Sequence, residues 1–183
     1  MSVMRYAALA LAVFRGREAE TAELTASATT DAKRRGEGAW LPFVRWVTAV
    51  LCNSLGRYEK ALTAAEQCSQ GSPAGLHLEA NWALVELIEA AARSGMPERA
   101  ADALQRLAAT TRASGTDWAR GIEARSRALI SDGDEAEACY REAIDVLGRT
   151  PLRVDLGRAQ LLYGEWLRRQ RRTRAHRTAS PPR

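Results

Sequence analysis

Apolar residues recur along most of this chain at steps of three and four. Between residues 40 and 54 this spacing is carried by Leu41, Val44, Val47, Val50 and Leu51. Steps of this size place side chains on one face of an α-helix. Valine and isoleucine are sparse and never alternate with polar residues, so no β-strand is expected. The pattern predicts an all-α fold.

Four glycines interrupt these helical runs in phase. Gly16, Gly56, Gly95 and Gly133 each lie between two apolar runs, and they are separated by 40, 39 and 38 residues. A period of roughly 20–50 residues is typical of repeat architectures. Around Ala136, Tyr140 and Ala143 the order small, large, small is that of the second helix of tetratricopeptide-type repeats. We therefore predict a right-handed α-α superhelix, a tetratricopeptide-like solenoid of about four helix pairs plus one extra helix.

Local signals set the expected helix ends. Gly95 supplies a left-handed residue that ends one helix, and Pro97 suits the first turn of the next. Thr116 or Asp117 is the candidate N-cap of a helix that extends to about Ile130. Residues 150–151, Thr-Pro, are expected to open a ninth helix.

The ninth helix is expected to lack a partner. The period places a glycine near position 171, but Arg171 and Arg172 occupy that region. We therefore expect Leu162 and Trp166 to be incompletely covered. Residues 170–183 show no apolar periodicity, which predicts a disordered basic tail after one helical-repeat domain over residues 1–169.

Charge is concentrated in this tail. The chain has a formal net charge of +5, but residues 168–183 hold seven of its 27 basic residues and no acidic one. The rest carries 20 basic and 22 acidic residues, a net charge of about −2. Clustered arginines neutralise phosphates, which makes the tail a possible nucleic-acid contact. The residues concerned are Arg168, Arg169, Arg171, Arg172, Arg174 and Arg177.

Candidate chemistry is scarce, and we expect no enzyme. Motifs for phosphate loops, dinucleotide binding and nucleophile elbows are missing, and His77 and His176 are the only histidines. Cys52, Cys68 and Cys139 form no metal-binding spacing and are expected to be buried free thiols. The acidic group Asp132, Asp134 and Glu135 fits a helix N-terminus better than a cation site. We expect no cofactor and no metal.

The first fourteen residues leave one alternative open. MSVMRYAALALAVF has the loose form of a secretion signal, but the run is too short for a membrane span and Arg15-Gly16-Arg17 follows it. Because Gly16 lies in phase with the later glycines, we interpret the run as the opening helix of the first repeat. A cytoplasmic protein without membrane contact is expected.

Three stretches carry a resemblance to a known family. They are LGRYEKALTAAE (residues 55–66), the run from LVELIEAAARSG to ARSRALISDG (residues 84–133) and EAEACYREAIDVLGRTPLRVDLGRAQLLYGEWLRR (residues 135–169). They resemble the helical-repeat segment of large LuxR-family transcriptional regulators, of the MalT-like kind abundant in actinobacteria. The likeness covers roughly residues 7–169.

In such regulators the repeats follow a nucleotide-binding module and precede a helix-turn-helix. The resemblance implies that the repeats sense an effector or protein partner, on a concave surface. This chain has neither flanking module, so ATP hydrolysis and sequence-specific DNA binding are not carried over, and a truncated or frameshifted gene product is one expectation. The alternative function is non-specific nucleic-acid association through the arginine tail. Trp46, Trp82 and Trp118 could contact a ligand, but packing between repeats is favoured.

Overall fold

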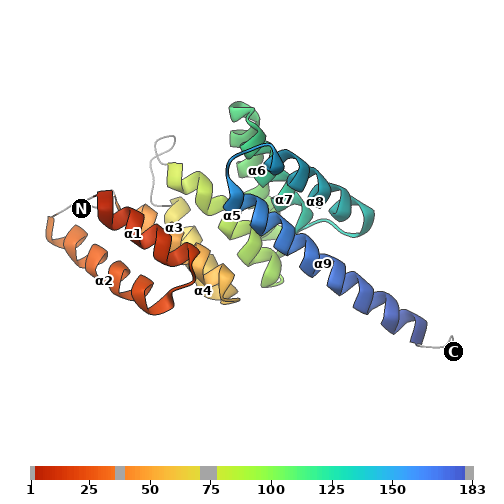
Figure 1. Ribbon diagram of the computed structural model, residues 1–183, viewed down its shortest axis with the longest axis horizontal. Helices are drawn as coiled ribbons and strands as arrows, with labels where there is room; N and C mark the ends of the chain where they lie inside the picture. The colour runs from red at the N-terminus through yellow and green to blue at the C-terminus, as the bar shows by residue number, and fades with distance from the viewer. Residues whose placement is uncertain (1–2, 36–39, 71–77, 180–183) are drawn as a thin grey trace. The chain divides into compact units, whose positions relative to one another are not determined.

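The computed structural model describes residues 3–35, 40–70 and 78–179, and these form helices without any strand (Figure 1). The all-α prediction is confirmed for this part of the chain. In order, the helices are α1 (Val3–Phe14), α2 (Glu18–Arg35), α3 (Leu41–Ser54), α4 (Tyr58–Gln70), α5 (Leu78–Arg93), α6 (Pro97–Ser114), α7 (Asp117–Ala128), α8 (Gly133–Gly148) and α9 (Arg153–Ala179).

The turn glycines adopt the left-handed conformation. Gly16, Gly56, Gly95 and Gly133 have φ of +66°, +70°, +71° and +55°, and Gly115 joins them at +62°. The first three turns are built alike. The glycine N–H bonds back three residues and the next N–H bonds back five, as in Arg57 N to Cys52 O at 2.8 Å. This is the Schellman arrangement that ends a helix. The fourth turn differs, because Gly133 begins α8 while α7 ends five residues earlier.

Replacing a turn glycine tests the left-handed turn alone. A Cβ at Gly95 would meet nothing within 4 Å, so a Gly95→Ala variant has no steric contact to relieve. It should still destabilise the protein by about 1–2 kcal/mol, the cost of left-handed backbone for an L-residue. Urea unfolding measures this. Gly148→Ala, at a glycine without positive φ and with equally open surroundings, is the control and should be neutral or stabilising.

Two helix starts test the predicted caps. Thr116 is the N-cap of α7, and its Oγ1 accepts a hydrogen bond from the Ala119 N–H at 3.2 Å. The predicted start of the ninth helix at Thr150-Pro151 is wrong by two residues. Thr150 Oγ1 instead donates to the Leu147 carbonyl and accepts from the Leu152 N–H, and α9 begins at Arg153. The threonine therefore shapes the turn after α8.

Contacts divide the chain into two compact units, Met1–Thr110 and Thr111–Arg183. Each repeat in an array contacts chiefly its neighbours, so such a division arises within one array as readily as between two domains. The single repeat domain over residues 1–169 stays a prediction.

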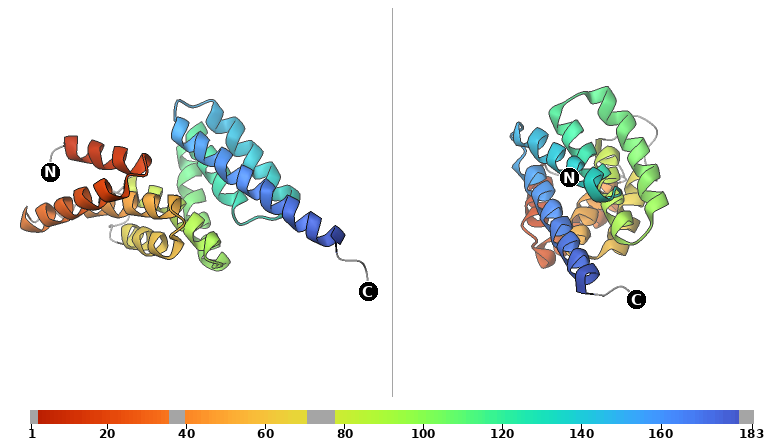
Figure 2. Two further views of the ribbon diagram at one scale, coloured as in Figure 1. Left: turned by 60° about the horizontal axis from the view of Figure 1, so that its bottom comes forward. Right: turned by 90° about the vertical axis from the view of Figure 1, so that its right-hand side faces the viewer.

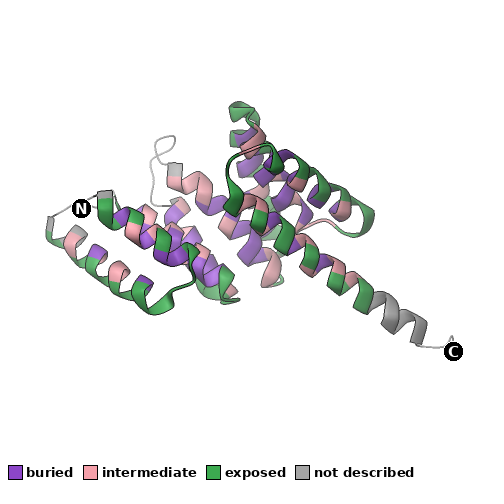
Figure 3. Ribbon diagram, viewed as in Figure 1, coloured by how far each residue is buried: buried purple, intermediate pink, exposed green. Residues whose placement is uncertain are grey.

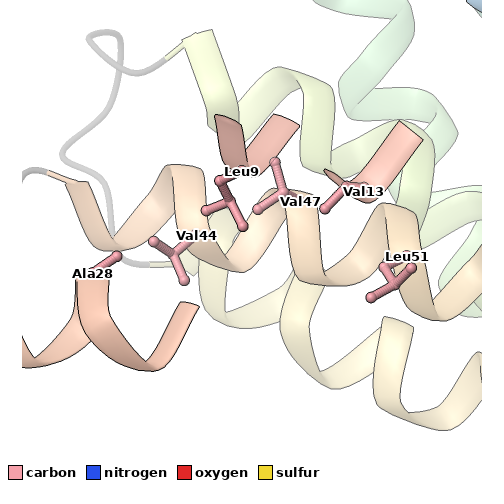
Figure 4. Packing of buried hydrophobic residues seen from close by; sticks show 6 residues of the cluster. All are labelled: Leu9, Val13, Ala28, Val44, Val47 and Leu51. Atoms are coloured by element: carbon pink, nitrogen blue, oxygen red, sulfur yellow. The ribbon is translucent and has the colours of Figure 1, made fainter. Parts of the chain in front are cut away.

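In the first unit, α3 is the central helix and packs against α1, α2, α4 and α5. Part of the core there is formed by α1, α2 and α3, through Leu9, Val13, Ala28, Val44, Val47 and Leu51 (Figure 4). Asn53 of α3 is buried, and its Nδ2 donates to the Glu86 carbonyl at 3.0 Å and to Glu86 Oε2 at 2.8 Å. This polar link fixes α3 against α5.

In the second unit, α8 packs against both α7 and α9 (Figure 2). A Cβ built on Gly121 of α7 would lie 2.5 Å from Leu147 Cγ of α8, so only glycine permits this close approach. Leu162 and Trp166 of α9 are 1% and 8% exposed. The prediction that they are incompletely covered is wrong, because α9 turns this face toward α7 and α8. They pack with Ala128, Ala136, Cys139 and Tyr140.

Helix α9 continues to Ala179, ten residues beyond the predicted end of the helical domain (Figure 1). Arginine is among the better helix formers, so the backbone holds a helix here without an apolar face to bury. The last arginines before residue 180 therefore lie along a helix. Among the described residues, no helix combines the length and the hydropathy that a membrane-spanning segment requires.

Candidate interaction surface

A row of aromatic side chains runs along the odd-numbered helices of the first unit. Its consecutive ring contacts join Tyr6 to Phe43, Phe43 to Trp46 and Trp46 to Trp82, with centroid distances of 4.8, 5.6 and 4.8 Å. Two further rings extend it, Trp40 against Tyr6 at 4.2 Å and Phe14 near Trp46 at 6.4 Å. We call these six residues, from α1, α3 and α5 and the turn before α3, the aromatic row.

The row is only half covered. Phe14 and Trp40 are 48% and 37% exposed, whereas Tyr6 is buried. Phe43, Trp46 and Trp82 lie between these limits. Each ring contacts another ring of the row, and every member except Tyr6 keeps part of its surface exposed. Aromatic rings in such positions offer large, rigid contact area with little entropy to lose, as in many binding surfaces.

Sequence reasoning found part of this row and missed the rest. The sequence predicts that Trp46 and Trp82 pack between repeats, and their rings are in contact. Tyr6, Phe14, Trp40 and Phe43 were not singled out. One signal was present, since the aromatics before residue 83 all lie on or next to odd-numbered helices except Tyr58.

Trp118 plays a different part. Its Nε1 donates to Asp155 Oδ2 at 2.9 Å, and the Arg125 guanidinium lies 3.4 Å from Asp155 Oδ1. The Arg125 side chain is only 5% exposed and that of Asp155 is 30% exposed. This cluster holds α7 against the start of α9, so the role of Trp118 is to join these two helices.

The histidines and cysteines considered as catalytic or metal-binding residues form no common site among the described residues. His77 lies outside the described residues, and so does the side chain of His176. Cys52, Cys68 and Cys139 are buried free thiols, as predicted. Burial raises the pKa of the Cys68 thiol to about 11, so it is neutral at pH 7 and a poor nucleophile.

The acidic group at the start of α8 lies at the N-terminus of this helix. Asp132 is the N-cap residue, with no hydrogen bond from its side chain to the helix, and Asp134 and Glu135 occupy the first turn. The helix dipole favours carboxylates at this end. Across the described ranges, no three His, Cys, Asp or Glu side chains are placed to hold a metal ion.

The candidate nucleic-acid contacts lie on α9. Arg168, Arg169, Arg171 and Arg172 are exposed, and Arg169 is 4.0 Å from Glu165. The side chains of Arg174 and Arg177 lie outside the described residues. The exposed arginines follow directly after Trp166 and Leu167, where α9 leaves the apolar core of its unit (Figure 3).

Comparisons of this chain with protein-family models, with curated proteins and with solved structures find no match.

Proposed function

We propose that this chain is a non-catalytic interaction module whose helix pairs stack as a right-handed, tetratricopeptide-like superhelix. The observation that carries the proposal is the recurrence of one local unit. Three times a helix ends in a Schellman turn on a left-handed glycine and a second helix begins within two residues. Such units bury their apolar faces only by stacking, and stacked units form extended binding surfaces.

The likeness to the regulatory segment of LuxR-type activators agrees with this role. On this hypothesis the module acts in the cytoplasm. It binds a protein partner or a small effector and has no catalytic step or cofactor. The aromatic row is the surface we assign to this binding, because it is the largest set of contacting rings among the described residues and five of its six members are partly exposed.

Site-specific photo-crosslinking in the native host tests this proposal. A photoreactive residue replaces Phe14 or Trp40, the two most exposed members of the row, in the tagged full chain. Leu55, 39% exposed but outside the row, is the matched control position. We expect a defined adduct, resolved by intact mass, from the two row positions only. Adducts of equal yield from Leu55, or none from the row, would contradict the assignment.

A second candidate function rests on the arginines of α9. Their presentation along a helix beyond the core suits non-specific contact with nucleic-acid phosphates. Truncation after Leu167 removes all of them and leaves Leu162 and Trp166 in place.

Filter binding to duplex DNA measures the effect of this truncation. If the arginines bind, removing all of them should weaken binding at low salt by at least about tenfold. It should also flatten the salt dependence, by roughly 0.9 for each phosphate that is no longer neutralised. Unchanged, salt-sensitive binding by the truncated chain would exclude the arginines and point to the body of the protein.

A further inference from the structure

Helix α9 carries a second face, opposite its buried one. Val154 and Leu161 are 58% and 52% exposed, and Leu152 just before the helix is 44% exposed. Gly157 and Gly164 are exposed on the same helix, and a Cβ at either would meet nothing within 4 Å. The buried residues Ala159, Leu162 and Trp166 point the other way, toward α7 and α8.

These exposed residues form one continuous stripe. Positions 154, 157, 161 and 164 follow alternating steps of three and four, and the same steps continue to Arg168, Arg171 and Arg172. Residues at such steps share one face of a helix. We call this stripe the outer face of α9. It is apolar from Val154 to Leu161 and basic from Arg168 to Arg172. Figure 3 shows exposed and buried positions alternating along α9.

We infer that the outer face of α9 binds an amphipathic helix from a protein partner, one with bulky apolar residues along its stripe and carboxylates at the end that meets Arg168, Arg171 and Arg172. The positive charges of these three arginines favour carboxylates at the end of the partner helix that lies beside them. Small residues let two helices approach closely, so Gly157 and Gly164 leave room for the partner's large side chains beside Val154 and Leu161.

Two other occupants fit less well. A membrane surface favours amphipathic helices with wide apolar faces rich in aromatic and leucine residues, but here only Val154 and Leu161 protrude from the helix. A nucleic acid would use the arginines and leave the apolar half of the stripe exposed. The inference also concerns a different unit from the aromatic row, so it rests on the proposed function only in assigning protein binding to this chain.

The test uses the full chain and a designed helical peptide as the probe. The peptide has 21 residues, with leucine at every a and d position of three heptads and glutamate at the flanking positions of one half. Two control peptides permute the leucines, which removes the stripe, or replace glutamate with lysine. Binding is measured by fluorescence anisotropy. We expect binding by the first peptide only, at least tenfold tighter than by either control.

Paired variants separate binding from folding. In Gly157→Leu with Gly164→Leu, peptide affinity should fall at least tenfold, while the apparent melting temperature stays equal or rises, because glycine is a poor residue inside a helix. Arg168→Glu with Arg172→Glu should abolish the preference for the acidic peptide. Arg120→Glu with Arg149→Glu changes the net charge equally, at exposed arginines that are not part of α9, and should leave binding intact.

Several outcomes would overturn the inference. They are equal binding of all three peptides, glycine variants that bind as well as the parent chain, stripe-dependent binding to anionic phospholipid vesicles in place of the peptide, and self-association through this face in sedimentation. A failed peptide test with row-specific photo-crosslinks would remove the outer face and leave the proposed function standing. If the peptide binds as expected and the row gives no specific photo-crosslinks, the assignment of binding to the aromatic row falls and the outer face of α9 stands.

Discussion

Replacing Asp155 with alanine should destabilise the second unit by about 3 kcal/mol, the cost of leaving the buried charge of Arg125 without its partner. The Arg125 guanidinium is almost completely buried, and its ion pair with Asp155 at 3.4 Å compensates its charge. The same carboxylate accepts the Trp118 indole N–H at 2.9 Å. Asp155→Ala therefore removes two partners at once and holds α7 less firmly against α9.

Two companion variants separate the parts of this effect. Asp155→Asn keeps an acceptor for Trp118 and loses only the charge, so it should cost less than alanine. Arg125→Met removes the buried charge itself and leaves the partly exposed Asp155 bonded to Trp118. It should destabilise the protein least of the three variants. Urea unfolding measures the free energy of unfolding of each. An Arg125→Met variant as unstable as Asp155→Ala would show that the loss of the ion pair does not explain the destabilisation.

Gly121→Val should also destabilise the protein strongly, by about 3 kcal/mol, the upper part of the range for overpacking. The Cβ would fall 2.5 Å from Leu147 Cγ and 2.8 Å from Leu147 Cδ2, so α7 and α8 would be forced apart. Helix propensity alone would favour the substitution, since valine ranks above glycine. The expected loss is therefore a consequence of packing.

Coupling to Leu147 identifies the cause. Leu147→Ala opens a cavity and is destabilising by itself, by about 2–5 kcal/mol. If the steric contact explains the Gly121→Val effect, the double variant should cost at least about 1 kcal/mol less than the two single variants together. Gly157→Val, at a glycine with open surroundings, is the control and should be close to neutral. Additive losses would contradict the close-packing explanation.

The helices and most of their turns could be predicted from local pattern, for a physical reason. Steps of three and four define a buried helix face, and a left-handed residue after a helix requires glycine in most cases. Gly16, Gly56 and Gly95 therefore marked helix ends correctly. Gly133 and Thr150 were harder, because the same residue types also begin a helix or shape an irregular turn.

The ends and surfaces of α9 could not be predicted in this way. The length of α9 follows from the helix propensity of its backbone, because its last residues present no apolar face. The sequence prediction instead required an apolar face for a helix to form. The burial of Leu162 and Trp166 depends on how three helices meet, which no single spacing encodes. The aromatic row likewise forms from residues 76 positions apart, Tyr6 and Trp82, that are linked only through the fold.

We propose that the helix pairs stack as one continuous superhelix, and small-angle X-ray scattering of the full chain tests this stacking most directly. A compact globule of this length has a radius of gyration of about 16 Å. The proposed stack predicts a clearly larger value and a pair-distance distribution skewed toward long distances. A radius of gyration near about 16 Å with a symmetric distribution would contradict the claim and indicate a single helical bundle.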